Sequence, residues 1–152
     1  MRKELNMSFI FKDAFPSLQL KGRAEVLLED TVVTRVTTPR THDFLNIYLE
    51  SDHVITKDII REVEREIKKQ VINNSTTIVR IFETYKLPKA PELDKLYEEY
   101  SDSALLEIEG LNIMFFNMMR TATVTFDSSD VMKVSLADIP VYHVKEKEFA
   151  DL

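Results

Sequence analysis

The stretch Thr31–Thr38, TVVTRVTT, decides how the first half of this chain folds. Seven of its eight residues are β-branched, and such side chains favour extended strands over helices. The region rich in Val and Thr runs from Val26 to Thr38. After a break at Pro39–His42, the segment Asp43–Glu50, DFLNIYLE, resumes an alternation in which Leu and Ile fall on one face. Because the link is short, the sequence predicts a β-hairpin.

A helix and a third strand follow this hairpin. Apolar residues recur at helical spacing through residues 57–72, at Ile60, Val63, Ile67 and Val71. The segment Ser75–Tyr85 then alternates again, with Ile78, Arg80 and Phe82 opposite Val79 and Ile81. We therefore expect residues 26–86 to form a three-stranded sheet covered by the 57–72 helix. The mixed residues 1–22 predict a short helical turn and a loop whose Phe residues dock on this body.

Residues 87–91, LPKAP, are the best candidate for a linker, since two Pro in five residues favour an extended segment. The sequence therefore predicts a ββαβ module over residues 1–86, the linker 87–91, and a second module over residues 92–152. The second module begins with a helix of about 18 residues, for which Gly110 is the expected C-terminal cap.

A second helix over Leu111–Arg120 is apolar on nearly its whole circumference. A hairpin follows it, with a turn at Asp127–Asp130, and a further helix is expected around Lys145–Phe149. The fold class is thus α+β: a small ββαβ module, followed by a helical pair plus a β-hairpin.

The composition excludes several kinds of site. The chain has no Cys, three His and two Gly that are far apart, at Gly22 and Gly110. Thiol nucleophiles, zinc knuckles and glycine-rich phosphate loops are therefore excluded, and His42, His53 and His143 have no ligand-type neighbours at metal-site spacing. We expect no cofactor, no metal site and no catalytic residue. With no apolar run of membrane length and no signal peptide, the expected location is the cytoplasm.

Two sets of residues are candidates for binding. The basic side chains of the 57–72 helix could meet phosphate: Arg61, Arg65, Lys68 and Lys69. Intervening Glu residues and a net charge of −6 favour a solvated helix surface and predict weak or no direct nucleic-acid binding. The apolar second helix and the chain's end could instead contact protein, through Ile113, Phe116, Met119 and Phe149, or could be core.

Four stretches carry a resemblance to a known family: Leu27–Thr31, Ile47–His53, Glu64–Gln70 and Leu96–Tyr100. Together with the order of elements, they resemble the extreme N-terminal region of PolC-type DNA polymerase III of Gram-positive bacteria, over roughly Ser8–Leu136. The resemblance implies a first module similar to a domain of the clamp-loader tau subunit. It implies a second module similar to a K-homology fold, although Glu109–Asn112 lacks that fold's Gly-x-x-Gly loop.

The resemblance also implies a function. It suggests a non-catalytic N-terminal domain of a DNA-directed DNA polymerase, making protein contacts with the clamp loader, helicase or primase components and with the rest of the polymerase chain. A nucleic-acid-contacting module that binds single strands or primer is the alternative, and a free-standing enzyme is a third. The K-homology likeness further suggests a partial module, with a last helix and strand missing. In that case we expect the final residues to be mobile or held by a neighbouring chain through Phe149.

Overall fold

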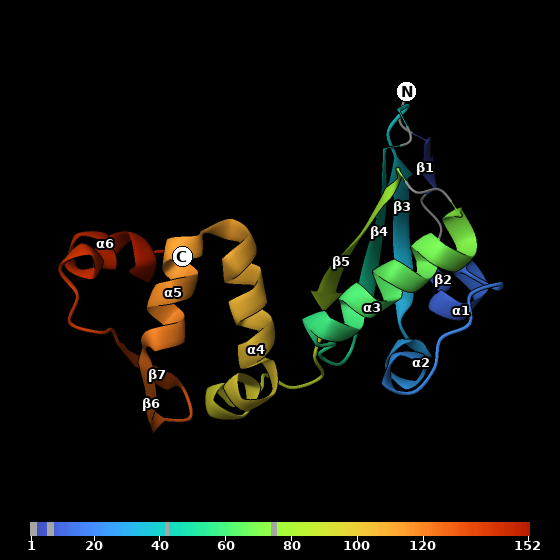
Figure 1. The fold of residues 1–152 in the computed structure, drawn as a ribbon. Coiled ribbons are helices and arrows are strands. Elements are labelled where there is room, and N and C mark those ends of the chain that lie inside the picture. The colour runs from blue at the N-terminus through green and yellow to red at the C-terminus, as the bar shows by residue number, and fades with distance from the viewer. Residues whose placement is uncertain (1–2, 6–7, 42, 74–75) are drawn as a thin grey trace. The chain divides into compact units, whose positions relative to one another are not determined.

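The computed structural model describes residues 3–5, 8–41, 43–73 and 76–152 (Figure 1). The chain divides into two compact units, Met1–Lys89 and Ala90–Leu152, which we call the N-terminal and C-terminal units. The boundary lies inside the segment 87–91. His42 and part of the link before the third predicted strand lie outside the described residues. Among the described residues, none of the helices combines the length and apolar character that a membrane span requires.

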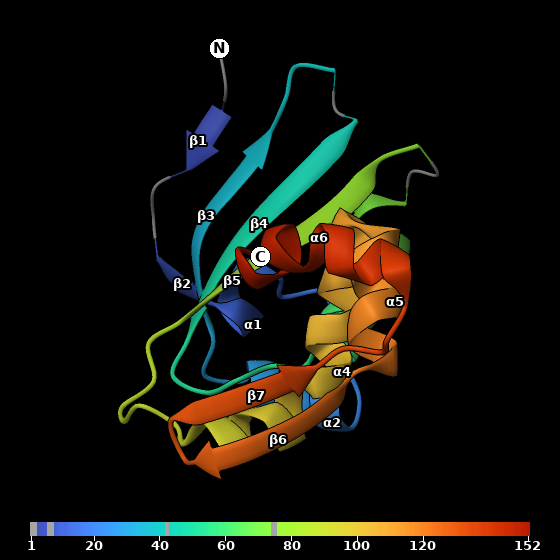
Figure 2. The same cartoon turned by 90° about the vertical axis from the view of Figure 1, so that its left-hand side faces the viewer.

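The N-terminal unit is built on one mixed sheet. Its strands are β1 (Lys3–Leu5), β2 (Phe9–Ile10), β3 (Val32–Thr38), β4 (Phe44–Ser51) and β5 (Ile78–Tyr85). Figure 2 views the sheet face-on, in the order β1-β3-β4-β5, and β2 also pairs with β3. The predicted hairpin is confirmed, because β3 and β4 pair antiparallel. β4 and β5 pair parallel, as two strands joined through a helix do.

Two expectations for this unit are wrong. The sheet has five strands rather than three, because β1 and β2 of the N-terminal segment add to β3. These strands have three and two residues, too few to show an alternation. The strand also begins at Val32 rather than Val26, since residues before it form the helix α2 (Arg23–Leu28). Ala24 and Leu28, four residues apart on one helix face, are both buried.

The core lies between one face of the sheet and its helices. The helix α3 (Lys57–Ile67) continues as a π-helical turn, η1 (Lys68–Ile72), which confirms the helix expected over 57–72. Its buried residues pack with Ile47, Leu49, Val79 and Ile81 of the sheet. The short helix α1 (Phe11–Ala14) is the predicted helical turn. Phe11 and Phe15 dock into the same core, as expected, whereas Phe9, for which the same was expected, is 37% exposed.

A β-bulge in β3 sets which side chains leave this core. The pairing with β4 runs from Val33↔Leu49 to Arg35↔Tyr48, so Thr34 is an extra residue. Val33 is buried, and in a regular strand Arg35 would lie on the same buried face. The extra residue brings Arg35 opposite Tyr48 on the other face. Val36 instead packs against the core.

The C-terminal unit contains three helices and a hairpin. They are α4 (Leu93–Leu111), α5 (Ile113–Thr121), β6 (Thr123–Ser128), β7 (Val131–Ser135) and α6 (Pro140–Ala150). Gly110 is not the cap, because α4 continues through it and ends at Asn112. The Asn112 side chain accepts hydrogen bonds from the backbone N–H groups of Met114 and Phe115 at the start of α5, a strong N-cap. Both units combine helices and strands, as expected, while the K-homology likeness of this unit stays a prediction.

Candidate functional site

The sheet face opposite α3 carries the densest group of residues suited to binding. Outward positions of β3, β4 and β5 alternate with the core positions, and we call them the open face: Arg35, Thr37, Phe44, Asn46, Tyr48, Ile78, Arg80 and Phe82. None of these side chains belongs to the core. Ile78 and Phe82 are 45% and 44% exposed, which is unusual for large apolar residues in a sheet.

Strand pairing arranges the open face in rows across the sheet. Arg35, Tyr48 and Phe82 are register partners on three neighbouring strands. The rings of Tyr48 and Phe82 are stacked, with centroids 5.1 Å apart and planes inclined by 19°. The guanidinium carbon of Arg35 lies 3.9 Å from the centroid of the Tyr48 ring. This row is therefore a continuous stack of one cation and two rings.

A second cation–ring pair lies on the same face. Arg80 holds its guanidinium carbon 4.6 Å from the centroid of the Phe44 ring. Arg35, Asn46 and Arg80 take part in lining a depression of about 220 Å³. Within the described part of the chain, no carboxylate forms an ion pair with either arginine, whereas Glu50 at the end of β4 is paired with Lys86 at 2.8 Å. The open face is thus locally basic in an acidic chain.

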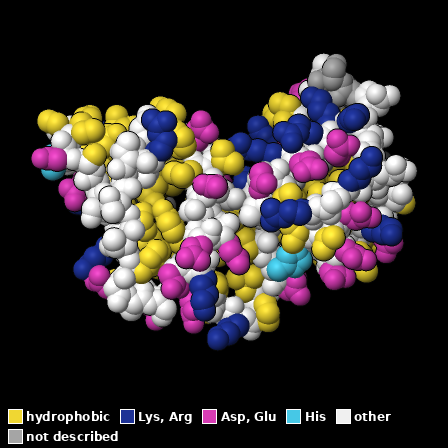
Figure 3. Space-filling view, turned by 60° about the horizontal axis from the view of Figure 1, so that its bottom comes forward, with side chains coloured by type: hydrophobic (Ala, Val, Ile, Leu, Met, Phe, Trp, Pro, Cys, Tyr) yellow, Lys and Arg dark blue, Asp and Glu magenta, His cyan; other side chains and the backbone are white. Residues whose placement is uncertain are grey.

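Sequence reasoning selected a different basic group, on α3 and η1. The structure brings three of its members, Arg61, Arg65 and Lys68, along one groove. Lys69 lies apart from them, in a second depression with Glu62 and Glu66. On the face of the molecule drawn in Figure 3, Lys and Arg side chains are interspersed with Asp and Glu. The four predicted residues therefore do not form one basic patch.

Glu64 lies in the groove of Arg61, Arg65 and Lys68. Its carboxylate accepts a hydrogen bond from the backbone N–H of Ile81 at 2.8 Å. Burial, the largest effect, raises the pKa of Glu64, and this hydrogen bond partly opposes the shift. Glu64 thus provides an acceptor for a backbone N–H group of β5. In the sheet order of the described residues, β5 stands at the end next to β4, and the outer backbone groups of such an edge strand lack a strand partner.

An apolar groove forms a separate surface of the same unit. The segment from Phe11 to Glu29, which comprises α1, α2 and the loop between them, lines a groove of about 550 Å³. Its apolar lining includes Phe15, Leu18, Leu20 and Val26, of which Val26 is 70% exposed. Charged residues also line it: Lys12, Lys21, Glu25 and Glu29. An apolar floor with a charged rim is typical of protein-binding pockets.

The predicted protein-contact residues of the C-terminal unit are divided by the structure. The buried positions of α5 belong to Phe115 and Met118, whereas Ile113 is 61% exposed. Phe116 and Met119 are half-buried. The Phe149 ring packs edge-to-face on Phe115 with centroids 5.8 Å apart. α6 therefore holds Phe149 within its own unit, although the sequence had also allowed for a contact with a neighbouring chain. Figure 3 shows further hydrophobic side chains on this unit, at the left of the view.

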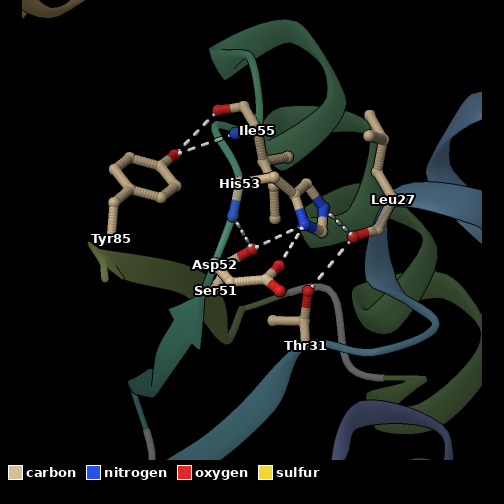
Figure 4. Close-up of polar contacts among 7 residues, drawn as sticks. All are labelled: Leu27, Thr31, Ser51, Asp52, His53, Ile55 and Tyr85. Atoms are coloured by element: carbon tan, nitrogen blue, oxygen red, sulfur yellow. Dashed lines mark hydrogen bonds and ion pairs between the residues drawn. The ribbon is translucent and has the colours of Figure 1, made fainter. Parts of the chain in front are cut away.

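A Ser–Asp–His cluster at the end of β4 has the composition of a catalytic triad (Figure 4). In a triad, the base contacts its nucleophile and its acid through different ring nitrogens. Here Nδ1 of His53 faces both Asp52 Oδ1, at 2.8 Å, and Ser51 Oγ, at 3.3 Å. Nε2 donates to the Leu27 carbonyl oxygen at 2.8 Å. Ser51 is also buried, and one ring nitrogen faces both the serine and the aspartate, so the cluster ties β4 to α2 and does not have the arrangement of a triad.

Within the described ranges, no group of three His, Asp or Glu residues is placed to hold a metal ion. The open face could have been suspected from the sequence, because Ile78, Arg80 and Phe82 alternate against Val79 and Ile81. Its connection to Arg35 and Tyr48 depends on strand pairing and on the bulge.

Comparison with known proteins gives one result. Residues 10–81 match the family model described as DNA polymerase III polC-type N-terminus I. The matched segment contains the apolar groove and nearly all of the open face. No curated protein and no solved structure matches the chain.

Proposed function

Since residues 10–81 match the family model of the polC-type DNA polymerase III N-terminus I, we propose that this chain is a non-catalytic domain that binds partner proteins of the replication machinery. The expected partners are components of the clamp loader, the helicase or the primase. The supporting observation is the apolar groove of residues 11–29, which lies inside the matched segment.

The groove suits an apolar side chain from a partner segment. Anchor residues that fill such a pocket supply most of the binding energy of many protein interfaces, and polar residues around them exclude water. Lys12, Lys21, Glu25 and Glu29 provide charges of both signs around the groove. These charges favour a partner segment with polar residues flanking its apolar anchor.

The experiment measures capture of purified clamp-loader, helicase and primase components by the 152-residue chain and by two variants. Val26→Asp places a charge in the groove, and because Val26 is 70% exposed the fold should survive. Val71→Asp makes the same change at a residue that is 37% exposed and does not line the groove. We expect Val26→Asp to weaken partner binding at least tenfold and Val71→Asp to leave it unchanged. Equal effects of the two variants, or no capture of any component, would refute the proposal.

A further inference from the structure

We propose that the open face of the sheet binds single-stranded DNA, with bases stacking on the Arg35–Tyr48–Phe82 row and phosphates meeting Arg80 and Arg35. This site lies outside the apolar groove and goes beyond the protein contacts proposed above. It also differs from the basic residues of α3.

The open face exposes groups on which a base can stack. Tyr48 is stacked between the Arg35 guanidinium on one side and the Phe82 ring on the other, and Phe82 is 44% exposed on the β5 side of the row. A base can extend this stack, because aromatic side chains and guanidinium planes both stack on unpaired bases. A duplex keeps its base faces covered by neighbouring bases, so the row selects single strands.

The charges of the open face are complementary to those of a nucleic-acid backbone. Arg35 and Arg80 each lie over a ring and form no ion pair within the described residues, so both charges are available to an anion. Asn46 lies between Thr37 and Arg80 in the strand register and adds an amide donor to the same depression. Two cations and an amide suit a phosphate.

The spacing of these groups along β5 matches that of a nucleotide. Arg80 and Phe82 lie two residues apart on β5, about 6.6 Å along the strand. A nucleotide can therefore place its base on Phe82 while its phosphate contacts Arg80. Ile78, the aliphatic member of the open face, extends the apolar surface on β5. This mixture of rings and cations suits nucleotides better than the largely aliphatic anchors of a protein partner. The match to a DNA polymerase family makes DNA the expected strand.

The test is fluorescence anisotropy of a labelled thymidine 12-mer with the 152-residue chain at several salt concentrations. For two phosphate contacts, log K should fall against log salt with a slope of about −1.4. Arg80→Gln should reduce the magnitude of that slope by about 0.7. Phe82→Ala should weaken binding roughly tenfold, and Phe82→Tyr, which keeps the ring, should retain it.

Matched controls lie on other surfaces of the same unit. Lys69→Gln makes the same charge change in the depression beside Glu62 and Glu66, and Val71→Ala removes apolar surface from η1; neither should alter binding. The proposal is overturned if Lys69→Gln acts like Arg80→Gln, if a 12-base-pair duplex binds as tightly, or if no oligonucleotide binds at low salt. A uridine 12-mer that binds tenfold more tightly would overturn the assignment to DNA. Val26→Asp should leave oligonucleotide binding unchanged, which separates this test from that of the proposed function.

Discussion

The replacements Gly110→Ala and Gly22→Ala should change stability in opposite directions. Gly110 lies in the last turn of α4, where a Cβ would meet nothing within 4 Å. Ala stabilises a helix relative to Gly by about 0.5–1 kcal/mol, so the C-terminal unit should become more stable by that amount. If Gly110 instead capped the helix in a left-handed conformation, the same change would destabilise the unit by about 1 kcal/mol.

Gly22 provides the contrast. It precedes α2 with φ at 61° and ψ at −132°, a conformation that residues with a Cβ rarely adopt. The open space around its Cβ position does not reduce the destabilisation by Gly22→Ala. The cost comes from the backbone conformation itself and amounts to about 1–3 kcal/mol. Urea unfolding followed by NMR signals of residues 8–41 and 90–152 measures the two effects separately. A loss of stability in Gly110→Ala would refute the assignment of Asn112 as the residue that ends α4.

Three further predictions concern polar contacts. Asn112→Ala removes the acceptor of two α5 N–H groups and should cost about 1–2 kcal/mol in urea unfolding, whereas Asn112→Asp should cost far less. His53→Ala removes one of two donors to the Leu27 carbonyl, which keeps its hydrogen bond from Thr31 Oγ1 at 3.1 Å, and should cost about 1 kcal/mol, while Asp52→Ala, at an exposed ion pair, should cost less; equal costs would contradict the role given to Nε2. Because the pKa of Glu64 is raised above 4.5, the folded unit holds that proton more tightly than the unfolded chain. Its contribution to stability is complete below pH 4.5 and is lost as the pH rises through the raised pKa. The stability of the wild type relative to Glu64→Gln should therefore fall as the pH rises above 4.5 in urea unfolding, and a constant difference would refute a raised pKa of Glu64 in the folded unit.

Strong local periodicity explains what could be predicted from the sequence. The predictions of the 57–72 helix and of the strand ending at Tyr85 were correct, because each element places several apolar residues on one face. β1 and β2 were missed because strands of two or three residues have no visible period and exist through their pairing with β3. Gly110 was misassigned because the capping strength of Asn112 was overlooked.

The binding surfaces were harder to predict, because they depend on contacts between distant segments. A helical projection placed Lys69 with Arg61, Arg65 and Lys68, and the structure separates it from them. The stack of Arg35, Tyr48 and Phe82 joins three strands whose register cannot be read from a single sequence. The apolar groove is formed by a short irregular stretch around α1 and α2, for which periodicity gives no signal.

The bulge at Thr34 has a consequence for changes in chain length. A deletion inside a strand normally exchanges its two faces beyond the missing residue, which buries polar side chains and exposes the core. Because Thr34 is the unpaired extra residue between the pairs Val33↔Leu49 and Arg35↔Tyr48, a chain shortened by Thr34 alone would keep both pairs and both faces. Deletion of Val36 would instead move each of the β3 side chains that follow it to the opposite face of the sheet. β3 therefore contains one position at which natural variants of this domain can differ in length while Val33 stays inside and Arg35 stays outside.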